Sequence, residues 1–269
     1  MRGGLAVALV AAGLCGACGQ APARLGELVN SAGVEKSDAG PAPPDVARRG
    51  FEAPDAVVRV EHGDVLGDEA PETVAALAGG AGVEVRDAAG AVQARLATDG
   101  YLTAMALVPA SRAPKRDLAL YLYPDATGGG TFEVRTPGDA LVATWSESPP
   151  PSHFAVAAWQ GDPALVYLQG DDLVVRSPMG APLARLGAPE GSFFTDLFAT
   201  TVGGRLVLLA SGNGYVPYHA LFVYSGDGRL LYEDVADEQA FGLEALPGGQ
   251  GVAVFARSRV WHYRLPGAR

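Results

Sequence analysis

The sequence predicts an all-β fold built from five similar units, and three observations support this prediction. A strand followed by a glycine-containing turn recurs five times, as VEVRDAAG, FEVRTPG, LVVRSPMG, LFVYSGDG and VWHYRLPG, with equivalent positions 40 to 49 residues apart. The chain contains 36 glycines in 269 residues, about twice the usual share, which indicates many turns. Almost no window sustains a helical apolar period of about 3.6 residues beyond two turns.

Each unit contains further strand-like segments in a constant order. A more continuously apolar segment precedes every recurring strand, as in TVAALAGG and PALVYLQG, and such runs are typical of strands buried on both faces. A β-prone piece such as AVVRVEHG precedes each apolar segment, and a short strand such as AVQARLA follows the turn. Four short strands per unit, repeated radially, predict a β-propeller with five blades. The expected repeats cover about residues 56–100, 101–147, 152–190, 193–235 and 240–269.

The last unit is expected to be incomplete, because no fourth strand follows VWHYRL. A missing outer strand leaves an exposed sheet edge, which natural β-proteins avoid. We therefore expect an N-terminal strand to complete the last blade, and RRGFEAP around Phe51 is the expected source. An open solenoid and a ring completed by a partner are the structural alternatives.

The first 18 residues predict export. Arg2 precedes an apolar run over residues 5–14, and small residues follow, which is the pattern of a removable secretory signal. The run is too short for a permanent transmembrane helix, which needs about 20 apolar residues. Its end, LCGAC, resembles the bacterial lipoprotein signal, and this resemblance implies lipidation of Cys18. Cleavage after Ala23, which would release a soluble exported protein, is the alternative.

Residues 19–50 are rich in Ala, Pro and Gly and are expected to form a flexible tether, with the folded domain over residues 51–269. Both cysteines, Cys15 and Cys18, lie in the signal, so the mature domain can hold no internal disulfide and no cysteine-ligated metal. Gly19 rather than aspartate follows Cys18, and the resemblance to lipoproteins then implies the outer membrane of the bacterial cell envelope. A periplasmic or secreted protein is the alternative.

The net charge of the chain limits the classes of partner that it can bind. The formal net charge is −10 and the pI is near 4.8. These values argue against nucleic acid as a partner, because its phosphates require a basic surface. They also argue against electrostatic docking on anionic lipid. Membrane attachment is therefore expected only through a lipid anchor.

The first unit carries an acidic loop, GDVLGDEAPE, between two expected strands. The segment VEHGDVLGDEAPETVAALAGGAGVEVRDAAGAV resembles the FG-GAP/VCBS repeat family, whose blades carry a calcium-binding loop of pattern DxDxDGxxD. The resemblance places Asp64, Asp68 and Glu72 at ligand positions, while Leu66 replaces the middle ligand and Glu69 replaces the turn glycine. Calcium requires about six to eight oxygen ligands. The loop is therefore either a weak calcium site or a solvated acidic turn.

No catalytic set is apparent in the sequence. The four histidines show no HxH or HExxH spacing, and no serine lies in a GxSxG motif. The favoured function is therefore a non-enzymatic envelope protein that binds, or serves as a scaffold for, a protein or glycan partner. A small extracytoplasmic hydrolase or lyase with a polar central site is the alternative, because the fold alone does not exclude an enzyme.

The expected binding face is the rim that carries the loops between the second and third strands, together with the connections between blades. Residues 124–130 and 211–219 form insertions in two of these loops, and long loops on a rigid scaffold commonly carry function. Tyr215, Tyr218 and His219 add groups of the kind enriched at binding hot spots. We predict that a partner binds at these three residues, with packing of the inner strands as the structural alternative.

Overall fold

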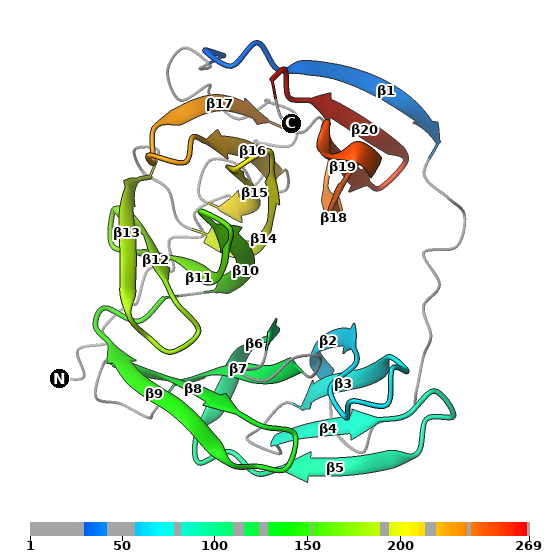
Figure 1. Cartoon of the computed structure of the whole chain (residues 1–269), viewed down its shortest axis with the longest axis vertical. Helices are drawn as coiled ribbons and strands as arrows, with labels where there is room; N and C mark the ends of the chain where they lie inside the picture. The colour runs from blue at the N-terminus through cyan, green and yellow to red at the C-terminus, as the bar shows by residue number, and fades with distance from the viewer. Residues whose placement is uncertain are drawn as a thin grey trace, which may run out of the picture.

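The computed structural model describes residues 30–41, 57–77, 82–109, 116–123, 129–151, 153–188, 194–212, 219–235 and 238–267. These residues form five antiparallel four-stranded sheets, which Figure 1 shows arranged in a ring. The predicted five-bladed all-β propeller is confirmed. Within these ranges the only helical element is a short 3-10 turn, η2 (Pro247–Gly249). None of the described residues forms a helix with the length and apolarity needed to span a bilayer.

Blades 1 to 4 each pair their strands in chain order, so each of them is a meander. Blade 1 consists of β2 (Val57–Gly63), β3 (Glu72–Leu77), β4 (Gly82–Arg86) and β5 (Val92–Leu96). Blade 2 consists of β6 (Tyr101–Pro109), β7 (Arg116–Tyr123), β8 (Gly130–Arg135) and β9 (Leu141–Glu147). Blade 3 consists of β10 (Phe154–Trp159), β11 (Asp162–Gln169), β12 (Asp172–Arg176) and β13 (Pro182–Gly187).

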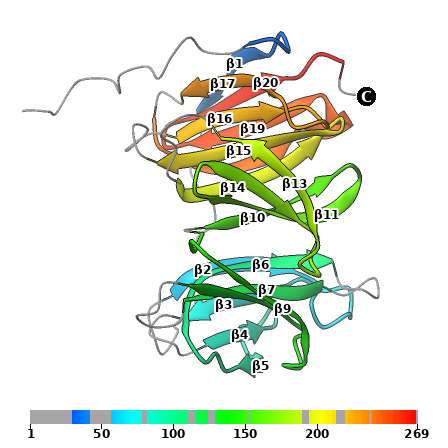
Figure 2. The same ribbon diagram turned by 90° about the vertical axis from the view of Figure 1, so that its left-hand side faces the viewer.

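The remaining two blades follow the same plan. Blade 4 consists of β14 (Phe194–Val202), β15 (Arg205–Gly212), β16 (His219–Tyr224) and β17 (Leu230–Val235). Blade 5 takes β18 (Ala240–Ala245), β19 (Gly251–Ala256) and β20 (Arg259–Arg264) from the end of the chain and β1 (Glu35–Pro41) from its beginning. In Figure 2 blades 3 to 5 lie in the upper part of the molecule, and blades 1 and 2 lie in the lower part.

An N-terminal strand completes the last blade, as expected, but it lies upstream of the expected position. β1 pairs antiparallel with β20, from Glu35 opposite Arg264 to Pro41 opposite Arg259. This strand falls within the segment expected to be a tether, whereas the residues around Phe51 lie outside the described part of the chain. This edge strand is held mainly through backbone pairing with β20 and buries little side-chain surface. Its sequence, EKSDAGP, therefore needs no alternation of apolar and polar residues and shows none.

A few side chains reinforce the closing strand. The Lys36 ammonium lies 2.9 Å from a carboxylate oxygen of Asp234 and 4.8 Å from the centre of the Trp261 ring. Val34 is buried in the cluster between blades 4 and 5, and the Ser31 amide donates to a carbonyl of blade 4 at 2.8 Å. The N-terminal segment is therefore attached to both blade 4 and blade 5.

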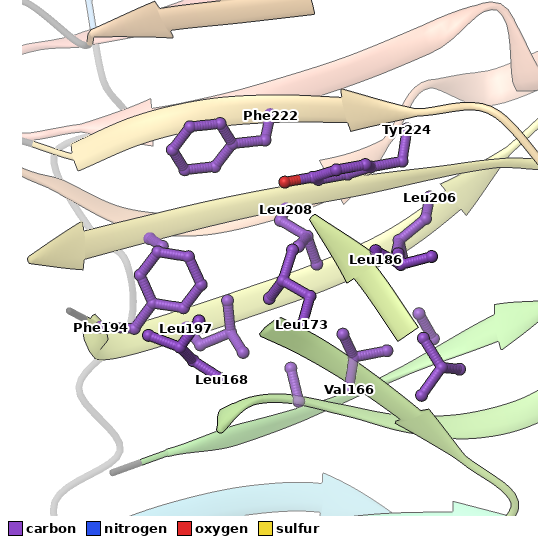
Figure 3. Close-up of a cluster of buried hydrophobic side chains, with 14 of the residues drawn as sticks. Val166, Leu168, Leu173, Leu186, Phe194, Leu197, Leu206, Leu208, Phe222 and Tyr224 are labelled. Carbon is purple, nitrogen blue, oxygen red and sulfur yellow. The ribbon is translucent and has the colours of Figure 1, made fainter. Parts of the chain in front are cut away.

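Buried apolar side chains gather between neighbouring blades. Four clusters of described residues join blades 1 and 2, 2 and 3, 3 and 4, and 4 and 5. Figure 3 shows the cluster between blades 3 and 4, in which Val166 and Leu168 of β11 share a core with Leu208 of β15 and Phe222 of β16. Each blade is a two-sided layer, which explains why its second strand is a nearly continuous apolar run. No cluster of described residues joins blades 5 and 1.

Four blades share one turn between their third and fourth strands. In blade 1 the Gly90 amide donates to the carbonyl three residues earlier at 2.9 Å, and Gly90 has φ of 84°. The same bond and a positive φ recur at Asp139, Gly180 and Gly228. In blade 2 the left-handed position is therefore Asp139 and not Gly138, the glycine that the repeat pattern suggested. Aspartate occupies this conformation more readily than most residues because its short side chain bonds locally.

The recurring arginine at the end of the third strand holds this turn in place. The Arg86 guanidinium donates to the Gly90 carbonyl at 2.9 Å, and Arg176 donates to the Gly180 carbonyl at 2.8 Å. In blade 2 the equivalent Arg135 bonds the Asp139 carboxylate at 2.6 Å. The repeat that revealed the fold in the sequence is therefore a structural motif rather than a binding motif.

Candidate functional site

The acidic loop between β2 and β3 brings together the three carboxylates that the sequence singled out. One carboxylate oxygen from each of Asp64, Asp68 and Glu72 lies within 4.8 Å of the other two. Glu72 is buried at the start of β3, Asp64 is partly buried, and Asp68 is exposed. Three oxygens at this spacing can face one hard cation, although calcium requires about six to eight.

Backbone amides already satisfy much of this carboxylate charge. The Glu72 Oε2 atom accepts from the amides of Val65 at 2.8 Å and Leu66 at 3.1 Å. The Asp64 Oδ1 atom accepts from the Gly67 amide at 2.6 Å. Bonds of this kind close the loop without a metal, as they do in polar turns generally.

Two departures from the calcium pattern have clear structural consequences. Glu69 adopts φ of 69° and thus keeps the left-handed conformation that the family pattern assigns to glycine. Leu66 packs against the apolar cluster between blades 1 and 2, so a core contact replaces the middle ligand. The loop therefore lacks a side-chain oxygen at position 66, where the calcium pattern has a ligand.

We expect the unmodified loop to bind calcium no more tightly than about 0.1–1 mM, the range typical of weak extracellular sites. The double variant Leu66→Asp with Glu69→Gly should bind at least about tenfold more tightly, because it restores a ligand and removes the backbone strain. Calorimetric titration measures both affinities. Asp64→Ala in the double variant is the control and should abolish the gain. Micromolar binding by the unmodified loop would contradict this expectation.

The residues predicted to form the binding rim are only partly described by the structure. Tyr215 and Tyr218 lie outside the described residues. His219 opens β16 and is 3% exposed, so it is not a surface contact group. The His219 Nδ1 atom accepts a hydrogen bond from the Ala240 amide at 3.2 Å, and this bond links blade 4 to blade 5. The predicted partner contact is therefore wrong for His219, which is buried and has the alternative, structural role.

A different pair of aromatic residues is exposed on the same rim. Tyr101 opens β6 and Tyr123 closes β7, and the two residues are direct cross-strand partners. Tyr101 is 62% exposed and Tyr123 is 37% exposed. In a meander the start of the first strand and the end of the second lie at one rim, the rim of the predicted loops. The sequence pattern did not single out this pair, because the pairing of Tyr101 with Tyr123 depends on the register of two strands.

Polar groups on the innermost strand of blade 1 are engaged with each other. The Arg59 Nε atom lies 2.9 Å from Glu61 Oε1. The same guanidinium lies 6.0 Å from the centre of the Phe198 ring on β14 of blade 4. The contact joins the inner strands of two blades that are not neighbours in the ring. These groups form an ion pair with a cation–π contact and do not form a recognisable nucleophile and base.

Comparison with known proteins identifies the fold alone. No protein-family model and no curated protein sequence matches this chain. The crystal structure of BBS1N in complex with ARL6DN aligns with a TM-score of 0.55 and 11% identity, covering 81% of this chain and 69% of that chain. A protein of unknown function from Bacteroides caccae aligns with a TM-score of 0.51 and 12% identity, covering 76% and 72%. At such low identity these likenesses establish a common architecture and no shared activity.

Proposed function

We propose that this chain is an exported, lipid-anchored β-propeller of the bacterial outer membrane that binds a protein or glycan partner as a scaffold. The observation that carries the proposal is the exposed pair of Tyr101 and Tyr123 on one rim of a rigid ring. Exposed tyrosines on such a scaffold are enriched at binding surfaces. The described residues present no assembled catalytic set beside them, which favours binding over catalysis.

The closing strand sets how far the propeller could lie from the proposed lipid anchor. With Cys18 as the lipidated residue, only residues 19–29 separate the anchor from the first described residue, Asn30. A fully extended chain of this length spans at most about 40 Å. If Cys18 carries the lipid, the attachment of Ser31 and Val34 to blades 4 and 5 would hold the propeller close to the membrane, with that edge toward the anchor.

The comparisons and the first blade support the binding part. The propeller-like neighbour BBS1N was crystallised in complex with ARL6DN, so a protein partner is among the partners that we propose here. The FG-GAP/VCBS-like sequence of blade 1, with its loop at Asp64, supports descent from a repeat propeller whose calcium loop has lost a ligand.

Labelling with a palmitate analogue tests the anchor. The unmodified protein should incorporate the label and partition with outer-membrane detergent extracts, and Cys18→Ala should abolish both properties. An unlabelled, freely soluble product that Cys18→Ala does not change would refute lipid anchoring while leaving export intact.

Capture from envelope extract tests the binding rim. The immobilised domain should retain a defined partner, and the double variant Tyr101→Ala with Tyr123→Ala should lose it without a lower melting temperature. The matched control is Leu141→Ala with Leu183→Ala, two exposed side chains that lie at the opposite rim. Equal capture by both double variants would show that Tyr101 and Tyr123 do not bind the partner.

A further inference from the structure

The strand that closes blade 5 buries less of itself than the outer strand of any other blade. Each of the other outer strands buries at least one side chain, and these include Leu96 of β5, Glu147 of β9, Leu186 of β13 and Tyr232 of β17. None of the 7 residues of β1 is buried. Figure 1 shows β1 at the outer edge of its blade, beside β20. The hydrophobic effect therefore contributes little to holding β1 in place.

Two side chains of the N-terminal segment do reach the interior. Val34, immediately before β1, is 6% exposed and packs in the cluster between blades 4 and 5. Lys36 is the second, and its ammonium group lies 2.9 Å from Asp234 Oδ2. The same group lies 4.8 Å from the centre of the Trp261 ring and 5.7 Å from the centre of the Tyr263 ring. Asp234 belongs to blade 4 and both rings belong to β20, so Lys36 attaches β1 to two blades.

A second ion pair of β1 adds little to this attachment. The Asp38 carboxylate pairs with the Arg259 guanidinium, but the two side chains are 36% and 54% exposed. Exposed pairs of this kind contribute little to stability, because water screens them. The pairing of β1 with β20 also loses its regular register between Asp38 and Pro41. The contacts of Lys36 are therefore the main side-chain contribution of β1 itself.

A strand held in this way opens at a lower free energy than strands that share in the apolar clusters. We propose that residues 30–41 form a latch that detaches from blades 4 and 5 while the other strands stay folded, and that the contacts of Lys36 determine how often it opens. Detachment breaks the pairing with β20 and the contacts of Val34 and Lys36. The clusters that join blades 1 to 4 contain no residue of the latch, so they persist.

Opening of the latch changes how far the propeller reaches from the membrane, and this consequence rests on the proposed lipid anchor. With the latch closed, residues 19–29 separate Cys18 from the first attached residue, Asn30. With the latch open, residues 19–56 separate Cys18 from β2. At about 3.4 Å per residue the maximum reach rises from about 40 Å to about 130 Å. The latch thus regulates the distance at which the propeller meets a partner.

Hydrogen exchange followed by mass spectrometry tests the latch on the intact protein. The amides of β1 that pair with β20 should exchange faster than the paired amides of the other outer strands. Lys36→Ala should speed exchange in β1 about tenfold, because it removes the attachment to Asp234 and to the two rings. Lys36→Arg should stay near the unmodified rate, because it keeps the charge. Asp38→Ala is the matched control and should change the rate by less than about twofold, because it removes an exposed pair.

A disulfide across the pairing distinguishes local opening from global unfolding. Ser37 and His262 are direct cross-strand partners, and residues 19–269 contain no cysteine except those introduced. Oxidation of Ser37→Cys with His262→Cys should remove the fast exchange of β1 that Lys36→Ala produces. Exchange that accelerates equally in all five blades of Lys36→Ala would overturn the latch, as would equal rates in Lys36→Ala and Asp38→Ala.

The latch and the lipid anchor can fail separately. Hydrogen exchange on the Cys18→Ala protein measures the latch without a lipid and should give the same rates. If the latch opens in a protein that takes up no palmitate label, the longer reach falls with the proposed anchor and the latch stands. A labelled protein in which β1 exchanges no faster than the other outer strands would overturn the latch and leave the anchor in place.

Discussion

Replacing Glu147 with alanine should lower the free energy of unfolding by about 3–5 kcal/mol, the usual effect of leaving a buried charge without its partner. Glu147 ends β9 of blade 2 and is 4% exposed. Its carboxylate accepts from the Tyr167 hydroxyl at 2.5 Å and from Gln169 Nε2 at 2.6 Å, and it pairs with Arg176 at 2.7 Å. All three partners belong to blade 3, so one side chain joins two blades.

Urea unfolding measures this loss. The matched control is Asp172→Ala, because Asp172 also pairs with an arginine, Arg185, at 2.9 Å, yet both side chains are about half exposed. An exposed ion pair of this kind contributes only about 0–1 kcal/mol. Glu147→Gln should fall between the two, since the amide keeps part of the hydrogen bonding and loses the charge. Equal destabilisation by Glu147→Ala and Asp172→Ala would show that the contacts of Glu147 with blade 3 contribute no more stability than an exposed ion pair.

Gly82→Ala should be the second strongly destabilising substitution, with a loss of about 2–5 kcal/mol. Gly82 opens β4 with φ of 94°, and a Cβ atom there would lie 2.0 Å from the Leu96 carbonyl oxygen on β5. Both the positive φ and the contact with backbone disfavour a side chain. The outer strand of blade 1 has to move away before alanine can be accommodated.

Gly90→Ala separates these two causes. Gly90 has a similar φ of 84°, but nothing lies within 4 Å of its Cβ position. Gly90→Ala should therefore lower the free energy of unfolding by only about 1–2 kcal/mol, the cost of holding alanine in the left-handed conformation. Thermal unfolding of both variants measures the difference. A Gly82→Ala protein as stable as the Gly90→Ala protein would mean that the close backbone approach is relieved at no cost.

The sequence could predict the five blades because the signals for them are local. The third strand ends in an arginine in four blades and in Tyr224 in blade 4. A tight turn follows, and the turn needs one residue in the left-handed conformation. Both requirements lie within a few residues, so they repeat visibly along the chain. The acidic loop was predictable for the same reason, since Asp64, Asp68 and Glu72 lie close in sequence and converge within one turn.

The closing strand was not predictable at its actual position, because its signal is not local. The residues of β1 are mostly polar and exposed, and β1 joins blade 5 because β20 otherwise has an unpaired edge. Nothing in EKSDAGP itself specifies that partner. The same holds for His219, which resembles a surface contact group in the sequence but is buried because β18 of the next blade packs over it.

The sequence by itself determined the fold class, the number of blades and the place of the acidic loop, since periodic strands and turns depend on neighbouring residues. Only the tertiary structure decided which strand closes the ring, which carboxylate joins two blades and which aromatic side chains reach the surface. Tyr101, Tyr121 and Tyr123 are all tyrosines at strand ends or near them, yet one is buried and two are exposed. Exposure depends on strand register and on the packing of the next blade, and neither is encoded within a short stretch of sequence.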